Sequence, residues 1–217
     1  MEVSFEIHWP YLALALAMLW FPRQWMRLGK WRPKRRKERE TMEKFATDGA
    51  VDPEDKSVRL ARELKSPRNY LDFFRALVGG VSLWEFSFTF GGEDRAIFFG
   101  LKIGITLIAV LIQLIRWRER ITFFAPIFFF AGLSIGMGNY FSGAMAFLLM
   151  CAINPVIPTP RLFISAFALL LLPFNVFLGA GLQLAVINSL LVLLGPLLSL
   201  LAKRPMVIFT RKRNLMW

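Results

Sequence analysis

The chain has 217 residues, of which 56% are hydrophobic and only 19% are charged, whereas soluble domains usually carry about a quarter charged residues. Lys and Arg total 27 against 15 Asp and Glu, which gives a net charge of +12. A single cysteine and a single histidine exclude an internal disulfide and any metal site that needs several Cys or His ligands. The composition indicates a membrane protein, and basic cytoplasmic loops explain the excess of Lys and Arg better than nucleic acid binding does.

The first apolar segment, residues 5–21, predicts an N-terminal transmembrane anchor within residues 1–22. A signal peptide begins with basic residues and ends at a small-residue cleavage site, but this segment begins with Glu2 and Glu6 and is followed by a basic stretch from Arg23. This order favours an uncleaved anchor with its N-terminus outside and its basic flank in the cytoplasm.

Residues 23–69 predict a basic cytoplasmic arm of short helices. The stretch has too few large apolar side chains to bury a core of its own, so we expect lipid headgroups or another protein to order it. Basic residues near an anionic leaflet each contribute about 1 kcal/mol to membrane binding. The residues expected to bind anionic lipid or a partner are Arg32, Lys34, Arg35, Arg36, Lys37 and Arg39.

Residues 70–202 predict a six-span membrane bundle. Between Ile121 and Ala202 the only full charge is Arg161, and a soluble domain of this size needs a charged exterior. Turn residues divide the bundle into three hairpins, at 70–115, 121–157 and 162–202, and the chain ends in a basic tail, residues 203–217.

The segment 70–90 is ambiguous because it contains Asp72, Arg75 and Glu85 among aromatic and aliphatic residues. It could lie flat at the membrane interface as an amphipathic helix. A crossing is favoured because it returns the arginines after residue 115 to the same face as the other basic loops. Asp72 and Arg75 would then lie at the inner boundary and face headgroups or cytoplasmic partners.

The predicted fold is therefore all-α: a polytopic integral membrane helix bundle of about seven transmembrane helices, with a short basic helical arm. The N-terminus is expected outside and the C-terminus in the cytoplasm. The compact size and the short outer loops favour the inner membrane of a bacterial cell.

Two charged residues carry the sharpest prediction within the apolar segments. Glu85 and Lys102 are equally far from the turn near residues 93 and 94, so antiparallel helices place them at a similar depth. A charge in hydrocarbon is expensive unless it is paired. We expect an intramembrane ion pair that fixes the register of the hairpin, with an ion relay as the less favoured role.

Glycines at helical spacing predict close helix packing. Gly100 with Gly104, Gly132 with Gly136, and Ser134 with Gly138 are small residues four apart, which lets two helices approach backbone to backbone. A broken helix around residue 139 that exposes backbone groups to a substrate is a weaker alternative.

Amide side chains within the apolar segments predict interhelical hydrogen bonds or, alternatively, a polar cavity at mid-depth. Gln113 belongs to this set, and the residues that could line such a cavity are Asn139, Asn154, Asn175, Gln183 and Asn188. The sequence does not separate the two roles.

No catalytic motif accompanies these features. His8 lies at an outer helix end, and Ser142 beside Gly143 lacks a histidine within the spans to activate it. The sequence predicts neither an enzyme nor a cofactor or metal. It favours a structural or accessory subunit, or a scaffold, of a larger membrane assembly, with membrane lipids, other membrane subunits or further copies of the chain as partners. The alternative is a small transporter or channel component with a polar mid-membrane site.

Overall fold

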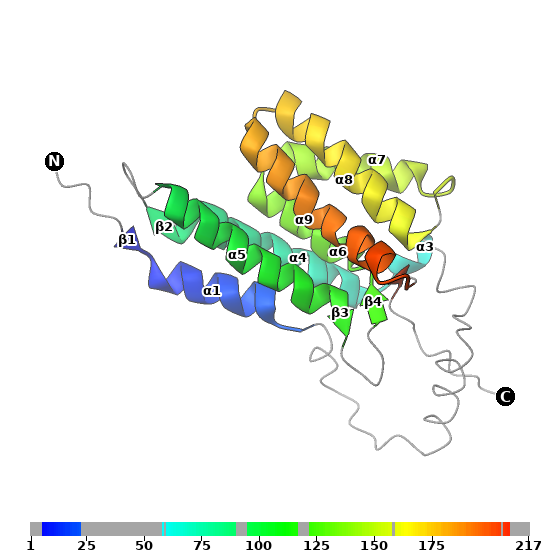
Figure 1. The fold of residues 1–217 in the computed structure, drawn as a ribbon, viewed down its shortest axis with the longest axis horizontal. Helices are drawn as coiled ribbons and strands as arrows, with labels where there is room; N and C mark the ends of the chain where they lie inside the picture. The colour runs from blue at the N-terminus through cyan, green and yellow to red at the C-terminus, as the bar shows by residue number, and fades with distance from the viewer. Residues whose placement is uncertain are drawn as a thin grey trace, which may run out of the picture.

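The computed structural model describes residues 6–22, 58, 60–89, 95–116, 122–157, 159–204 and 206–208. This part of the chain is helical, with two small β-sheets at helix ends (Figure 1). The helices are α1 (Trp9–Trp20), α3 (Leu60–Glu63), α4 (Pro67–Val81), α5 (Arg95–Leu114), α6 (Ile127–Met137), α7 (Tyr140–Ile153), α8 (Pro160–Phe177) and α9 (Leu182–Leu201). Helix α4 continues directly into a π-helical turn, η2 (Ser82–Phe86).

The two sheets lie at opposite ends of α5 (Figure 1). At one end, β1 (Glu6–Ile7) pairs antiparallel with β2 (Phe88–Thr89). At the other end, β4 (Thr122–Phe124) pairs antiparallel with β3 (Ile115–Arg116) and parallel with β5 (Met206–Val207). Segments far apart in the sequence are thereby joined at both ends of the bundle.

Local sequence explains where the helices begin and end. Proline opens α4 and α8 at the first helical position, where its missing N–H costs nothing. The side chain of Asn139 caps α7 by accepting a hydrogen bond from the backbone N–H of Phe141 at 3.0 Å. Gly179 and Gly181 have φ values of +84° and +79°, a conformation that favours glycine, and they form the turn between α8 and α9.

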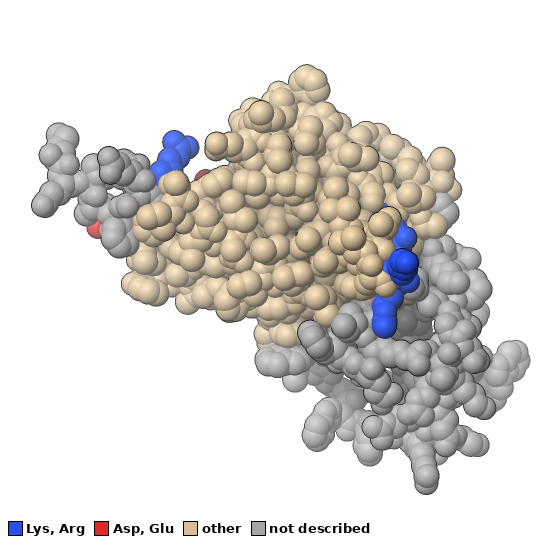
Figure 2. Space-filling view, viewed as in Figure 1, with Lys and Arg blue, Asp and Glu red and all other residues tan. Residues whose placement is uncertain are grey.

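Three helices, α5, α8 and α9, are long and apolar enough to cross a membrane, since a crossing needs about twenty residues. Figure 2 shows a broad face of the described surface without charged side chains, with basic residues gathered at its edges. Partly or fully exposed basic residues include Arg161 at the start of α8 and Lys203 and Arg204 after α9. The fold is compatible with a membrane location.

The core is centred on α6, whose eleven residues are all buried. Glycines bring its backbone against α4. A Cβ added at Gly136 would lie 2.8 Å from the carbonyl oxygen of Leu77, and one added at Gly80 would lie 3.2 Å from the Cα of Gly136. A Cβ at Gly132 would collide with the carbonyl of Phe73. Helices α4 and α6 therefore pack backbone to backbone.

Most predicted helical segments lie over an observed helix, but residues 122–124 at the start of the expected 121–157 hairpin form β4, and α1, α6 and α7 have only 12, 11 and 14 residues. The expected basic tail, 203–217, differs at its start. Met206, Val207 and Ile208 are buried, because β5 completes the sheet that β3 and β4 begin. The predicted lipid-binding cluster, from Arg32 to Arg39, lies outside the described residues.

Candidate functional site

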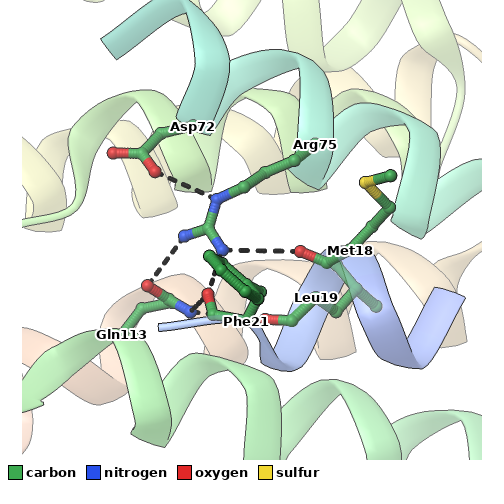
Figure 3. A network of polar contacts seen from close by, with 6 residues as sticks. All are labelled: Met18, Leu19, Phe21, Asp72, Arg75 and Gln113. Carbon is green, nitrogen blue, oxygen red and sulfur yellow. Dashed lines mark hydrogen bonds and ion pairs between the residues drawn. The ribbon is translucent and has the colours of Figure 1, made fainter. Parts of the chain in front are cut away.

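A buried ion pair lies where α1, α4 and α5 meet (Figure 3). The Nε atom of Arg75 donates to Oδ1 of Asp72 at 3.0 Å, and the two side chains are only 5% and 2% exposed. The guanidinium also lies over the ring of Phe129 on α6, 5.2 Å from its centroid. The pair thus connects α4 to the fully buried helix.

The rest of the guanidinium binds the C-terminal end of α1 and a side chain of α5. Arg75 donates through Nη1 to the carbonyls of Met18 and Phe21 and through Nη2 to Oε1 of Gln113, the last at 2.8 Å. The amide nitrogen of Gln113 donates to the carbonyls of Leu19 and Phe21 at 3.3 and 3.1 Å. Both side chains therefore satisfy carbonyl groups that a helix C-terminus leaves without intrahelical partners.

The expectation that Asp72 and Arg75 face headgroups or cytoplasmic partners is wrong, since Asp72 is 1% exposed and Arg75 is 6% exposed. The physical reason lies in the three carbonyls at the end of α1, which attract a cation. An acid, two carbonyls and an amide oxygen inside the protein take the place of water around the guanidinium. The i, i+3 spacing of an acid and an arginine on one helix is the sequence signal for this pair.

Lys102 on α5 is also buried, at 5% exposed. Its Nζ donates to the carbonyl of Trp84 in η2 at 2.6 Å, and it lies 5.8 Å from the ring centroids of Trp84 and Phe88. Glu85 is exposed and is an electrostatic neighbour of this ammonium. The predicted ion pair stays a prediction, and the structure adds a carbonyl and two aromatic faces as partners of the lysine.

A second buried polar group, here called the amide cluster, consists of Ser134, Ser142, Asn175 and Asn188, all of them 0% exposed. They come from α6, α7, α8 and α9. The hydroxyl of Ser142 lies 2.7 Å from the carbonyl oxygen of Asn139 and 2.5 Å from Oδ1 of Asn175. Asn188 donates through Nδ2 to the carbonyl of Ser134 at 3.2 Å. Four helices thus bring their polar groups together at the break between α6 and α7.

Three of the five amides predicted to share a polar region lie near this break. Besides Asn175 and Asn188, Asn139 donates from Nδ2 to the carbonyl of Leu178 at 2.7 Å. Asn154 lies elsewhere, at the far end of α7, where it donates to the carbonyl of Val58 at 3.1 Å. Gln183 is exposed near the start of α9. The sequence could not separate these groups, because amides of like type give no indication of the helix face they occupy.

The predicted small-residue pairs also differ in what surrounds them. Gly132 and Gly136 contact α4, and a Cβ at Gly138 would lie 2.8 Å from Oδ1 of Asn175. Gly100 and Gly104 differ, because a Cβ at either would meet no described atom within 4 Å. This open face of α5 carries exposed apolar side chains, those of Ile97, Leu101, Leu107 and Ile108.

Within the described ranges, no group of three or more His, Cys, Asp and Glu residues is placed to hold a metal ion. His8 lies beside the sheet of β1 and β2, with its Nε2 2.8 Å from Oγ1 of Thr89. The polar groups that the structure brings together are hydrogen-bonding and ion-pairing groups within a helix bundle.

The fold is all-helical, and three of its helices are long and apolar enough to cross a membrane, which is compatible with the class of helical membrane proteins. No family model matches the chain, and neither the curated proteins nor the solved structures include one that matches it.

Proposed function

We propose that this protein is a multi-pass subunit that acts without catalysis, as an accessory or scaffold component of a larger membrane assembly. The observation that carries the proposal is the open face of α5 at Gly100 and Gly104. In a membrane, helices associate through close packing at small residues rather than through the hydrophobic effect. The same spacing in α6 is already occupied by α4, so the pair on α5 remains available to a helix from another chain.

The proposal includes seven crossings, with the N-terminus outside, the C-terminus inside and the inner membrane of a bacterium as location. Its support is the way in which the ends of the helices meet. The α6–α7 connection contacts the α8–α9 turn through Asn139 and Leu178, whereas β3, β4 and β5 join the other ends of α5, α6 and α9. Successive helices that run back and forth fit alternating crossings, and the basic arm would then meet anionic headgroups at the cytoplasmic face.

The test replaces Gly100 and Gly104 together by leucine. A Cβ at either position meets no described atom within 4 Å, so the subunit should fold with little change in thermal stability. The added side chains would keep a partner helix from approaching. After extraction in a mild detergent, the unaltered chain should migrate as part of a larger assembly on size exclusion, and the variant should migrate alone.

A matched control is Ala152→Leu, which enlarges an exposed small residue on α7 and should leave the assembly intact. The proposal fails if the unaltered chain leaves its native membrane as a single subunit, or if the glycine variant keeps all of its partners.

A small transporter or channel component is the second candidate, and the amide cluster is the observation that favours it. Single cysteines in place of Asn175 or Asn188, in a Cys151→Ala background, test for contact with water. A transporter should let an aqueous thiol reagent reach these positions in at least one state. Lack of reaction in every state rejects this candidate and leaves the accessory role unaffected.

A further inference from the structure

The amide cluster contains more hydrogen-bonding groups than its members can satisfy for one another. Within the described part of the chain, Oγ of Ser134, Nδ2 of Asn175 and Oδ1 of Asn188 are buried and find no hydrogen-bond partner. Burying such a group without a partner is unfavourable, and the penalty is larger where lipid surrounds the protein. The great majority of buried polar groups in proteins are paired, many of them with ordered water.

The lack of hydrogen-bond partners does not depend on how the amide of Asn175 is oriented. The Ser142 hydroxyl has one proton but lies within hydrogen-bonding distance of two oxygens, the Asn139 carbonyl oxygen and Oδ1 of Asn175. Rotating the Asn175 amide by half a turn would let its nitrogen donate to Ser142 instead. Its oxygen would then take the place of the buried nitrogen. In either orientation, one atom of Asn175 still needs a partner.

The lack of a side chain at Gly138 lets both amides lie close to the backbone of the α6–α7 connection. A Cβ there would lie 2.8 Å from Oδ1 of Asn175 and 3.4 Å from Nδ2 of Asn188. The two amides, on α8 and α9, therefore approach the same point of the α6–α7 connection. The hydroxyl of Ser134 is four residues earlier on α6, so it lies one helical turn from this point.

The chemistry of these groups selects the ligand. Hydroxyls and amides are neutral, and none of the four side chains of the cluster carries a charge to balance an ion. Water offers two donors and two acceptors, and buried waters typically make about three hydrogen bonds to otherwise unsatisfied groups. We propose that the amide cluster binds ordered water between α6, α7, α8 and α9, bridging Ser134, Asn175 and Asn188. This site is independent of the proposed accessory function.

The test is a structure of the full chain in lipid nanodiscs, at a resolution that resolves ordered solvent. A solvent peak is expected within hydrogen-bonding distance, about 2.6–3.2 Å, of Oδ1 of Asn188 and of at least one of the other two atoms. The variant Asn188→Leu should lose the peak, because an isosteric apolar side chain removes one of its anchors. The control Ser165→Ala, ten residues before Asn175 on α8, should retain it.

Absence of a peak in the unaltered chain overturns the proposal, as does a peak that persists unchanged in Asn188→Leu. Density for an ion or a larger molecule also overturns it. If Asn188→Leu does not fold, the solvent density of the unaltered chain and of Ser165→Ala still decides the question.

Discussion

At the scale of single residues, the guanidinium of Arg75 connects three helices through one side chain. Its planar guanidinium binds an acid on its own helix, two carbonyls at the end of α1 and the amide of Gln113. Lysine offers a compact ammonium without the forked donors of arginine, so it could not make these contacts together. Arg75 thereby holds α1, α4 and α5 in one arrangement.

Arg75→Leu should be strongly destabilising, because it leaves Asp72 buried without its arginine and the carbonyls of α1 without this donor. Removing one partner of a buried pair typically costs about 3–5 kcal/mol. Thermal unfolding in a fixed detergent measures the effect. The control is Arg68→Leu on the exposed side of the same helix, which should change stability by less than about 0.5 kcal/mol. Equal effects of the two changes would contradict the role of Arg75.

Exchanging the charges of Glu85 and Lys102 tests whether the predicted ion pair accounts for the contribution of the buried Lys102 to stability. A glutamate at position 102 would place its carboxylate against the carbonyl of Trp84 and the negative faces of two rings. The double exchange should therefore remain as unstable as Lys102→Glu alone, measured by thermal unfolding. If the double exchange is as stable as the unaltered chain, the ion pair alone accounts for the contribution of both residues to stability.

At the scale of helices, identical spacing leads to different packing. Gly136 and Gly104 each belong to a pair of glycines four apart, but one faces the backbone of α4 and the other faces outward. Gly136→Ala should therefore destabilise the protein by about 1–3 kcal/mol through overpacking. Gly104→Ala should be neutral or stabilising by up to about 1 kcal/mol, because alanine favours helix. Unfolding in one detergent compares them, and a reversed order would contradict the packing of α4 on α6.

The helices themselves could be predicted from the sequence, because their ends coincide with charges and with proline and glycine. Pro160 begins α8 and Gly181 precedes α9, both close to their expected places. Which face of each helix is buried could not be predicted. Helix α6, for example, is apolar on every side, so its sequence has no periodicity that distinguishes one face from another. The burial of Asp72 and Arg75 depends on α1 ending beside them, which is a contact between segments about fifty residues apart.

At the scale of the whole molecule, the proposed alternation of crossings can be tested with two positions at opposite ends of the last hairpin. Ala180 lies in the α8–α9 turn and Thr159 precedes α8. Single cysteines at these positions, in a Cys151→Ala background, should react with a membrane-impermeant thiol reagent from opposite sides of oriented vesicles. Labelling of both from the same side would contradict the crossing by α8.

Strand β5 has a consequence for the biogenesis of the protein. The backbone N–H of Ala125 donates to the carbonyl of Val207 at 2.9 Å, so this edge of β4 stays unpaired until a segment about eighty residues later in the chain has been made. The ribosome has therefore made all of α6, α7, α8 and α9 before this sheet can close. A nascent chain that stalls after α9 would expose an unfinished strand edge, which is the kind of surface that quality-control proteases and chaperones encounter.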